Sequence, residues 1–192
     1  MAITPVPLRR WRRVEYERMV EKGIFRADDR LELLDGLLVV KEPQDSPHAT
    51  CVALVVDSLR TAFGPGWHVR QGAPIALDRW SEPEPDVCVV PGSPRDYRDA
   101  HPTRPVLIVE VSHSRLRFDR TRKASAYARA GIADYWIVDV IGRALEVHRE
   151  PARPDARPRR WRYQSVERLS SDATVTPLAA PGARIAVADL LP

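Results

Sequence analysis

The sequence contains little cysteine and little lysine, and it has no long apolar run. Cys51 and Cys88 lie inside apolar stretches and lack the spacing of a zinc site, so we interpret both as buried thiols in a reducing compartment. No apolar run approaches the roughly 18 residues that a membrane span needs. Residues 1–13 lack the apolar middle region of a signal peptide. These absences predict a cytoplasmic protein that has no contact with a membrane.

Charge of both signs is abundant, with a small basic excess: 30 Lys and Arg residues against 26 Asp and Glu residues give a net charge of +4. This balance is compatible with a polyanionic partner without requiring one. Only three of the basic residues are lysines, Lys22, Lys41 and Lys123, a bias that we attribute to genomic codon usage. A lysine within an arginine-rich segment is still notable, because the two cations are not interchangeable.

Apolar periodicity and turn residues predict helices that alternate with buried strands. The Asp35-Gly36 pair between two apolar runs predicts a hairpin over 31–41. Elsewhere we expect helices at 11–21, 47–63 and 118–130, strands at 67–70, 74–77, 85–90, 105–111, 133–140 and 144–148, an exposed loop at 151–160, and peripheral strands at 161–164 and 184–187. This order predicts an α/β fold, a mixed central sheet flanked by helices. We expect one domain over 1–192, with its core at about 10–150 and a peripheral C-terminal tail at 151–192.

Two carboxylates interrupt strands that otherwise look buried, Asp86 and Glu110. A buried anion is costly unless it is paired or binds a metal ion. Two acids at corresponding depths on neighbouring strands would provide hard oxygen ligands for Mg²⁺ or Mn²⁺. Glu32, between Leu31 and Leu33, is a third acid in an apolar strand.

The helix predicted at 118–130 places Asp119, Lys123 and Tyr127 on one face, four residues apart. If this face packs beside the strand that carries Glu110, the Lys123 ammonium can reach the same site. A cation beside carboxylates can orient a water molecule or stabilise charge that develops on a phosphate.

Taken in order, these residues resemble the pattern of the Uma-two family within the restriction-endonuclease-like PD-(D/E)XK superfamily. The matching elements extend over about residues 10 to 150. They are Glu32-Leu33-Leu34-Asp35-Gly36, His48, Pro85-Asp86, Val109-Glu110-Val111-Ser112, Asp119 with Lys123, Tyr127, Gly131 and Tyr135-Trp136-Ile137-Val138-Asp139. One position departs from the superfamily motif, because Ser112 stands where a lysine is expected. In the closer family the lysine has moved to the helix, and Lys123 fits that position.

The resemblance implies a restriction-endonuclease-like fold and a metal-dependent endonuclease that hydrolyses DNA, working as a homodimer or small homo-oligomer. It implies that Asp86, Glu110 and the main-chain carbonyl of Val111 bind Mg²⁺ or Mn²⁺. Lys123 would position or activate the attacking water. Glu32 would hold a second metal ion or a metal-bound water. It assigns no role to four further residues, His48, His113, Tyr127 and Asp139.

Each residue also has an ordinary structural explanation. Asp86 could be an acid at the entry of a strand, and Lys123 with Asp119 could be a plain helix pair. Two other functions therefore stay open. One is a catalytically silent module that binds nucleic acid or protein, which would apply if the acids and Lys123 do not converge. The other is a phosphoesterase acting on RNA or a small nucleotide, which differs only in the groove that leads to the site.

Overall fold

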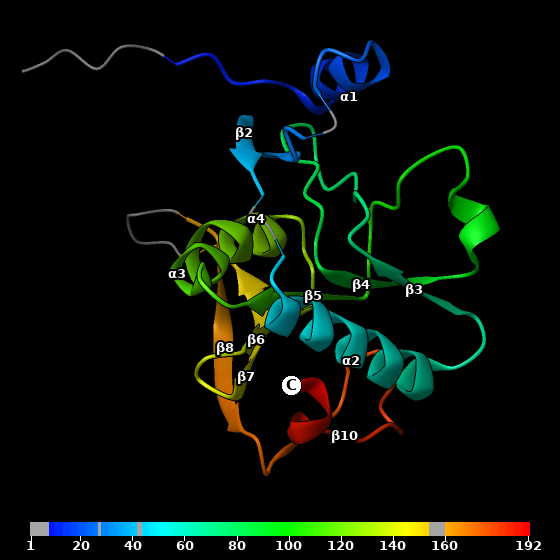
Figure 1. Ribbon diagram of the computed structural model, residues 1–192, viewed down its shortest axis with the longest axis vertical. Coiled ribbons are helices and arrows are strands. Elements are labelled where there is room, and N and C mark those ends of the chain that lie inside the picture. The colour runs from blue at the N-terminus through cyan, green and yellow to red at the C-terminus, as the bar shows by residue number, and fades with distance from the viewer. Residues whose placement is uncertain (1–7, 27, 42–43, 154–159) are drawn as a thin grey trace, which may run out of the picture.

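The computed structural model describes residues 8–26, 28–41, 44–153 and 160–192 (Figure 1). Its helices and helical turns are α1 (Arg13–Glu21), α2 (Ser46–Phe63), η1 (Pro94–Tyr97), α3 (Leu116–Phe118), η2 (Asp119–Lys123), α4 (Ala124–Arg129) and η3 (Val187–Leu190). Its strands are β1 (Leu31–Leu34), β2 (Leu37–Val40), β3 (Trp67–Gln71), β4 (Val87–Pro91), β5 (Leu107–Ser112), β6 (Asp134–Asp139), β7 (Ala144–Ala152), β8 (Arg162–Ser170), β9 (Thr174–Val175) and β10 (Ile185–Ala186).

A six-stranded sheet with the order β3-β4-β5-β6-β7-β8 forms the centre of the fold. Its neighbours are antiparallel except for β5 and β6, which are parallel. Parallel neighbours need a crossover connection, and here it consists of α3, η2 and α4. The crossover therefore lies on one face of the sheet, where α4 is nearest to β7 and β8 and the side chains of Lys123 and Tyr127 reach Glu110 of β5.

Helices cover both faces of this sheet (Figure 1). Because side chains alternate along a strand, Val109 and Val111 of β5 pack on the α2 side. Ile108 packs on the opposite side with Tyr127 of α4. Glu110 has the same parity as Ile108, so its carboxylate points toward the crossover helices. The α/β fold with a mixed, helix-flanked sheet is confirmed.

The predicted hairpin is present as β1 and β2, which form a separate two-stranded sheet. Asp35 and Gly36 both have positive φ angles, 54° and 76°, as a tight hairpin turn requires. A Cβ atom at Gly36 would come within 2.7 Å of the Arg10 Cβ, so this position needs glycine for space as well. Backbone bonds between Leu33 and Glu82 attach the hairpin to the segment that precedes β4.

Most predicted elements are confirmed within a few residues, but three segments before residue 161 differ from the expectation. Residues 74–77 are not a strand: the N–H groups of Ile75 and Ala76 donate to Pro83 and Pro102, which are loop residues, although Ile75 is fully buried. The helix expected at 118–130 begins at Leu116 and contains a π-helical turn over Asp119–Lys123. Of the loop expected at 151–160, residues 151 and 152 belong to β7, and 154–159 lie outside the described residues.

The C-terminal segment is not peripheral, in contrast to the expectation. β8 pairs with β7 through eight residue pairs and forms one edge of the central sheet. Further on, Val187, Leu190 and Leu191 are buried in the core beneath α2. The Leu190 carbonyl accepts a hydrogen bond from the buried Cys51 thiol at 3.0 Å. The sequence beyond residue 151 therefore completes the core, since α2 needs an apolar cover on this side.

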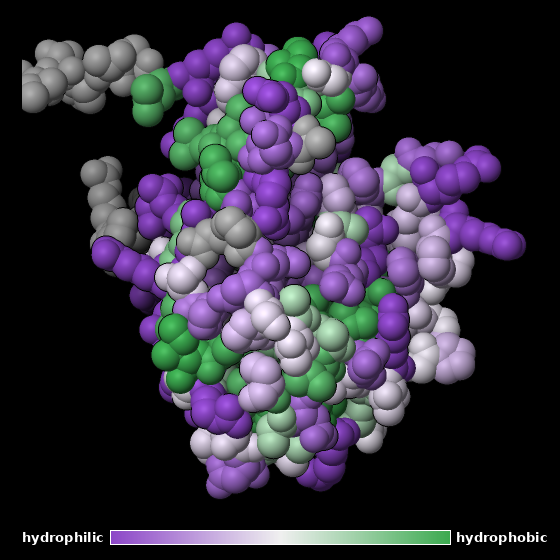
Figure 2. Space-filling model, viewed as in Figure 1, coloured by the Kyte–Doolittle hydropathy of each residue, from purple (hydrophilic) through white to green (hydrophobic). Residues whose placement is uncertain are grey.

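The surface carries mixed polarity, and in the view of Figure 2 apolar residues occur in separate patches among hydrophilic ones. Within the described ranges, no helix is both long and apolar enough to cross a membrane.

Candidate active site

A small pocket opens between the start of α2, the end of β5 and the crossover helices. Its volume is about 110 Å³. The four residues predicted to carry chemistry all line it, together with Val111, His48, His113 and Asp119. The hairpin contributes Glu32, the sheet contributes Asp86 and Glu110, and η2 contributes Lys123. Four segments that are distant in sequence therefore meet at one pocket.

Glu110 lies at the inner wall of the pocket and is 2% exposed. Its Oε2 accepts a hydrogen bond from Lys123 Nζ at 2.9 Å, and its Oε1 accepts one from the Tyr127 hydroxyl at 2.6 Å. Burial raises the pKa of Glu110 to about 8, although Lys123 acts in the opposite direction. The carboxyl is thus held by two specific donors in a place where ionisation is costly.

Lys123 is a buried cation between two acids. Its Nζ lies 2.9 Å from Glu110 Oε2 and 3.8 Å from Glu32 Oε1. Burial alone would lower the pKa of Lys123, but the carboxylates of Glu110 and Glu32 raise it above its usual value. Lys123 therefore keeps its charge at any physiological pH. Lys123 forms ion pairs with both of these acids, so it is more than the helix partner of Asp119.

Asp86 reaches the pocket from the residue before β4. The antiparallel register pairs Val87 with Val109, so one step further Asp86 comes level with Glu110. Asp86 Oδ2 accepts a hydrogen bond from the Val111 backbone N–H at 2.8 Å and lies 3.4 Å from His48 Nε2. Burial works against ionisation, but His48 and Lys123 hold the pKa of Asp86 below its usual value. Asp86 is therefore a carboxylate at neutral pH.

Glu32 is held from β1 at the other side of Lys123. It is 2% exposed. Its Oε2 accepts a hydrogen bond from the Glu84 backbone N–H at 3.0 Å, which leaves Oε1 directed toward Lys123. The hairpin residue that the sequence singled out is thus part of the same charged cluster as Glu110.

The donors present fit a hard divalent cation. Carboxylates and carbonyls are the ligands that Mg²⁺ and Mn²⁺ prefer, and the pocket contains Asp86, Glu110 and the backbone of Val111. The Val111 N–H donates to the Asp86 side chain and not to a β4 carbonyl. Val111 lies beyond the last residue pair of β4 and β5, so its carbonyl also lies outside that ladder of hydrogen bonds. Within the described ranges no three His, Cys, Asp or Glu side chains form a metal-binding group. The predicted set does not need three, because one of its ligands is a main-chain carbonyl.

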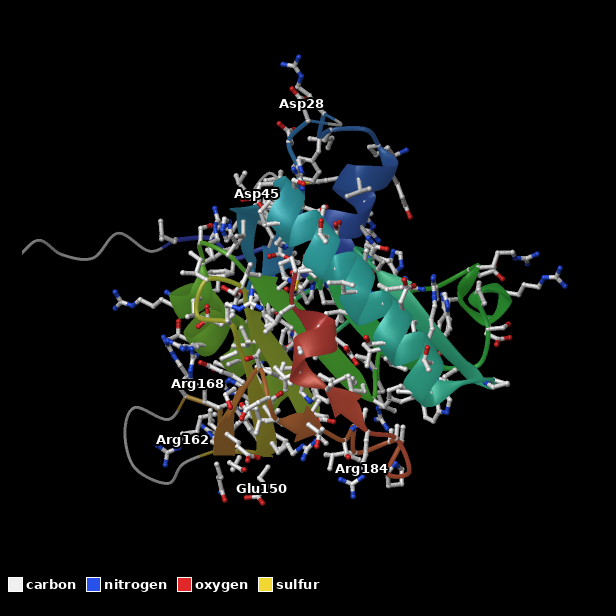
Figure 3. All side chains as sticks on the ribbon, turned by 60° about the horizontal axis from the view of Figure 1, so that its bottom comes forward. Asp28, Asp45, Glu150, Arg162, Arg168 and Arg184 are labelled. Atoms are coloured by element: carbon white, nitrogen blue, oxygen red, sulfur yellow. The ribbon has the colours of Figure 1, made fainter. Side chains whose placement is uncertain are left out.

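The structure gives contacts to the four residues that the sequence left without a role. Tyr127 binds Glu110, and His48 in the first turn of α2 contacts Asp86. His113 Nδ1 lies 2.7 Å from Oδ2 of Asp45, which also caps α2 (Figure 3). These contacts join distant segments, so spacing along the chain could not reveal them. Only the i, i+4 position of Tyr127 after Lys123 pointed to the site.

Asp139 is the exception among these residues, because it does not line the pocket. Its Oδ1 accepts the Gly142 N–H at 2.8 Å, and its Oδ2 pairs with Arg168 of β8 at 3.0 Å. Figure 3 shows Arg168 on the edge strand, away from Asp45 at the start of α2. Asp139 therefore fixes the turn between β6 and β7.

Comparison with known proteins agrees with the fold. The model of the Uma2 family, described as "Putative restriction endonuclease", matches residues 13–188. Among solved structures, "a putative nuclease belonging to DUF820 from Anabaena variabilis ATCC 29413" is similar to the chain, with a TM-score of 0.66 and 17% sequence identity. The match covers 86% of this chain and 92% of that chain. No curated protein matches the chain.

Proposed function

We propose, since the chain belongs to the Uma2 family of restriction-endonuclease-like proteins, that it is a metal-dependent endonuclease that hydrolyses the phosphodiester bonds of DNA. Membership in this family supports a nuclease; the dependence on Mg²⁺ or Mn²⁺ and the choice of DNA are our inference. We further propose that Asp86, Glu110, Lys123 and Glu32 carry the reaction.

The observation that carries the proposal is the burial of Lys123 between Glu110 and Glu32 beside an ionised Asp86. Burying charges costs several kcal/mol each, and apolar residues of similar size often give equal or better stability. A fold therefore has no structural need for such a cluster at the wall of a pocket. Perturbed charged groups that converge in a cleft are typical of active sites. Their convergence supports an enzyme over a silent binding module.

Within this site, Asp86, Glu110 and the Val111 carbonyl would hold the cation, and Glu32 would assist from the hairpin. A bound divalent cation would supply Lewis-acid polarisation of the phosphate and of a water molecule. Tyr127 orients the Glu110 carboxylate through its hydroxyl. Lys123 donates hydrogen bonds from a fixed, permanently charged ammonium group, so it can orient a water or stabilise negative charge on the phosphate.

The size of the pocket supports a polymeric substrate. A volume of about 110 Å³ is well below the roughly 300 Å³ at which pockets for whole small molecules begin. It can admit a phosphate group with a cation but not an entire nucleotide. The bases and sugars of a substrate would therefore remain outside, near rim residues that include Arg30, Lys41 and Arg115. This arrangement suits a nucleic-acid backbone better than a free nucleotide.

Plasmid cleavage in Mg²⁺, Mn²⁺ or EDTA tests the proposal. We expect nicking only with the cation, and its loss in Glu110→Gln and Lys123→Ala. Glu82→Gln is the matched control, because Glu82 is also a buried acid, 5% exposed, but does not line the pocket. Nicking by the control and not by Glu110→Gln would support the site. If purified protein cleaves neither DNA nor RNA with any divalent cation, the silent module becomes the better explanation.

The homo-oligomer and the cytoplasmic location expected from the sequence remain predictions. Light scattering after gel filtration tests the oligomer, and a monomer at working concentration would contradict it.

A further inference from the structure

The last residue of α4, Arg129, binds the hairpin that carries Glu32. Its Nη1 donates to Asp35 Oδ1 at 2.6 Å, in the turn between β1 and β2. Its Nε and Nη2 both donate to Asp78 Oδ2, at 3.0 and 2.8 Å. Nη2 also lies 3.3 Å from the Ser81 hydroxyl, which accepts the Asp35 N–H. One guanidinium thus connects the end of a helix, a hairpin turn and the segment before β4.

The crossover helices hold this hairpin at two points. Lys123 lies 3.8 Å from Glu32, and six residues later Arg129 binds Asp35, which follows Glu32 by three residues in the hairpin. Glu32 lies in β1 and Asp35 in the turn that follows it, and the β1–β2 sheet is separate from the central one. Among the described strands β1 pairs with β2 alone, and its other backbone bonds join Leu33 to Glu82 in the segment before β4. The position of Glu32 relative to Glu110 therefore depends on these bonds and on side-chain contacts.

We propose that Arg129 is a positioning residue that holds Glu32 against Lys123 by clamping the hairpin turn onto the end of α4. The inference rests on the proposed function, in which Glu32 assists at the site, and it assigns a role to Asp35, the acid of the hairpin turn. An arginine suits this role because its planar fork can bind two acids at once, whereas a lysine provides a single charged point. Arg129 touches neither Glu110 nor the pocket, so its effect on the reaction passes through the hairpin.

A structural role alone would give a different result, and the chain offers a matched control. Arg149 pairs with the fully buried Asp134 at 2.9 Å, and its side chain is 27% exposed, against 31% for Arg129. Arg149→Met and Arg129→Met each remove one partly exposed guanidinium from its acidic partners. The Asp134 side chain is fully buried, whereas those of Asp35 and Asp78 are 18% and 25% exposed, so general destabilisation would affect the control at least as strongly. Only Arg129 lies next to the hairpin, so a positioning effect would appear in Arg129→Met alone.

The hairpin position can be measured without reference to activity. Nitroxide labels at Leu37→Cys in β2 and Glu167→Cys in β8 report the distance from the hairpin to the central sheet, since both positions are exposed. Cys51 and Cys88 are 0% and 1% exposed and will not compete for the label. Double electron–electron resonance is recorded in Arg129→Met, in Arg129→Lys and in the Arg149→Met control. Asp35→Asn serves as a second variant, because asparagine tolerates the positive φ of this turn.

We expect a broadened or shifted distance in Arg129→Met and Asp35→Asn, an intermediate result in Arg129→Lys and no change in the control. In the cleavage assay, kcat should fall about 10- to 100-fold in Arg129→Met, since small misplacements at a site have effects of this size, while KM changes little. An unchanged distance overturns the clamp, whatever the activity. A shifted hairpin with unchanged kcat overturns the positioning role. If the parent protein cleaves nothing, the proposed function fails, and the distance alone still decides whether Arg129 fixes the hairpin.

Discussion

Replacing Tyr127 by phenylalanine isolates one hydrogen bond of the candidate site. The ring is fully buried and packs edge-on against Tyr135, with centroids 5.0 Å apart. Phenylalanine keeps this packing, so the change removes little more than the hydroxyl that donates to Glu110 Oε1 at 2.6 Å. The loss in stability then reports what the Tyr127–Glu110 bond contributes.

The expected magnitude follows from the charge of the acceptor. Hydrogen bonds to charged groups contribute about 1.5–3 kcal/mol, whereas neutral ones contribute about 0.5–1.5 kcal/mol. Tyr163 provides the neutral comparison, because its buried hydroxyl donates to the Ile132 carbonyl at 2.9 Å. At pH 9, above the raised pKa of Glu110 of about 8, we expect Tyr127→Phe to cost about 2 kcal/mol and Tyr163→Phe about 1 kcal/mol.

The sign of the pH dependence strengthens the test. Because the folded-state pKa of Glu110 is raised to about 8, its ionisation costs stability as the pH rises through that value. Without the Tyr127 donor, ionising Glu110 costs more stability, so the difference in unfolding free energy between parent and variant should grow from pH 6 to pH 9.

Urea unfolding in EDTA gives both the loss in stability and its pH dependence, provided that the m-value stays constant. A Tyr127→Phe loss no larger than that of Tyr163→Phe at pH 9 would refute the assignment of a carboxylate hydrogen bond.

Three further changes test other parts of the molecule. Asp86→Asn and Glu110→Gln should each abolish Mn²⁺ binding in calorimetry with an unchanged circular dichroism spectrum, since each removes a hard anionic ligand; normal affinity in both variants would remove them from the ligand set. Although burial opposes it, His148, whose Nε2 lies 3.4 Å from Glu146 Oε2, and the hydrogen bonds from Arg120 lower the pKa of Glu146 to about 2, so its stabilisation is present above about pH 4.5 and is lost as the pH falls toward 2. We expect the pH profiles of the unfolding free energy, measured in urea, to differ by roughly 2 kcal/mol between the parent and Glu146→Gln. This figure is reduced because solvent screens the charges of the half-exposed arginines. Parallel profiles would contradict this. Leu190→Ala should cost about 2–5 kcal/mol because Leu190 is fully buried, whereas Leu178→Ala, at a half-exposed position, should cost less than about 0.5 kcal/mol; equal losses would argue against a C-terminal core.

The sequence was sufficient to predict those elements that depend on residues close together in the chain. The Asp35-Gly36 turn and the continuous apolar runs of β5 and β6 are readable because turn residues and strand periodicity act over a few positions. The failure at 74–77 has a nonlocal cause: these residues are apolar and buried, but their N–H groups donate to loop carbonyls on Pro83 and Pro102. Nothing in a four-residue apolar run distinguishes a strand from a buried segment that is bonded to loops.

The same distinction applies to the candidate site. Glu110 and Lys123 were predictable because a charge in an apolar strand and a lone lysine in an arginine-rich helix are visible in sequence. Their 2.9 Å contact depends on the crossover between β5 and β6, which brings the Lys123 side chain of η2 to Glu110. The contacts of His48 with Asp86 and of Arg129 with Asp35 join segments 38 and 94 residues apart. Spacing gives no information on such pairs, so their roles emerge only from the fold.

The packing of the C-terminal segment under α2 has a consequence for how the protein forms during synthesis. The apolar side of α2 is synthesised well before the side chains that cover it, Val187, Leu190 and Leu191. A growing chain therefore exposes Cys51 and its apolar neighbours until η3 has emerged from the ribosome. Since α2 also presents His48 to Asp86, the pocket cannot settle into its final shape before then. Translation itself would thus delay the moment at which the candidate site becomes complete.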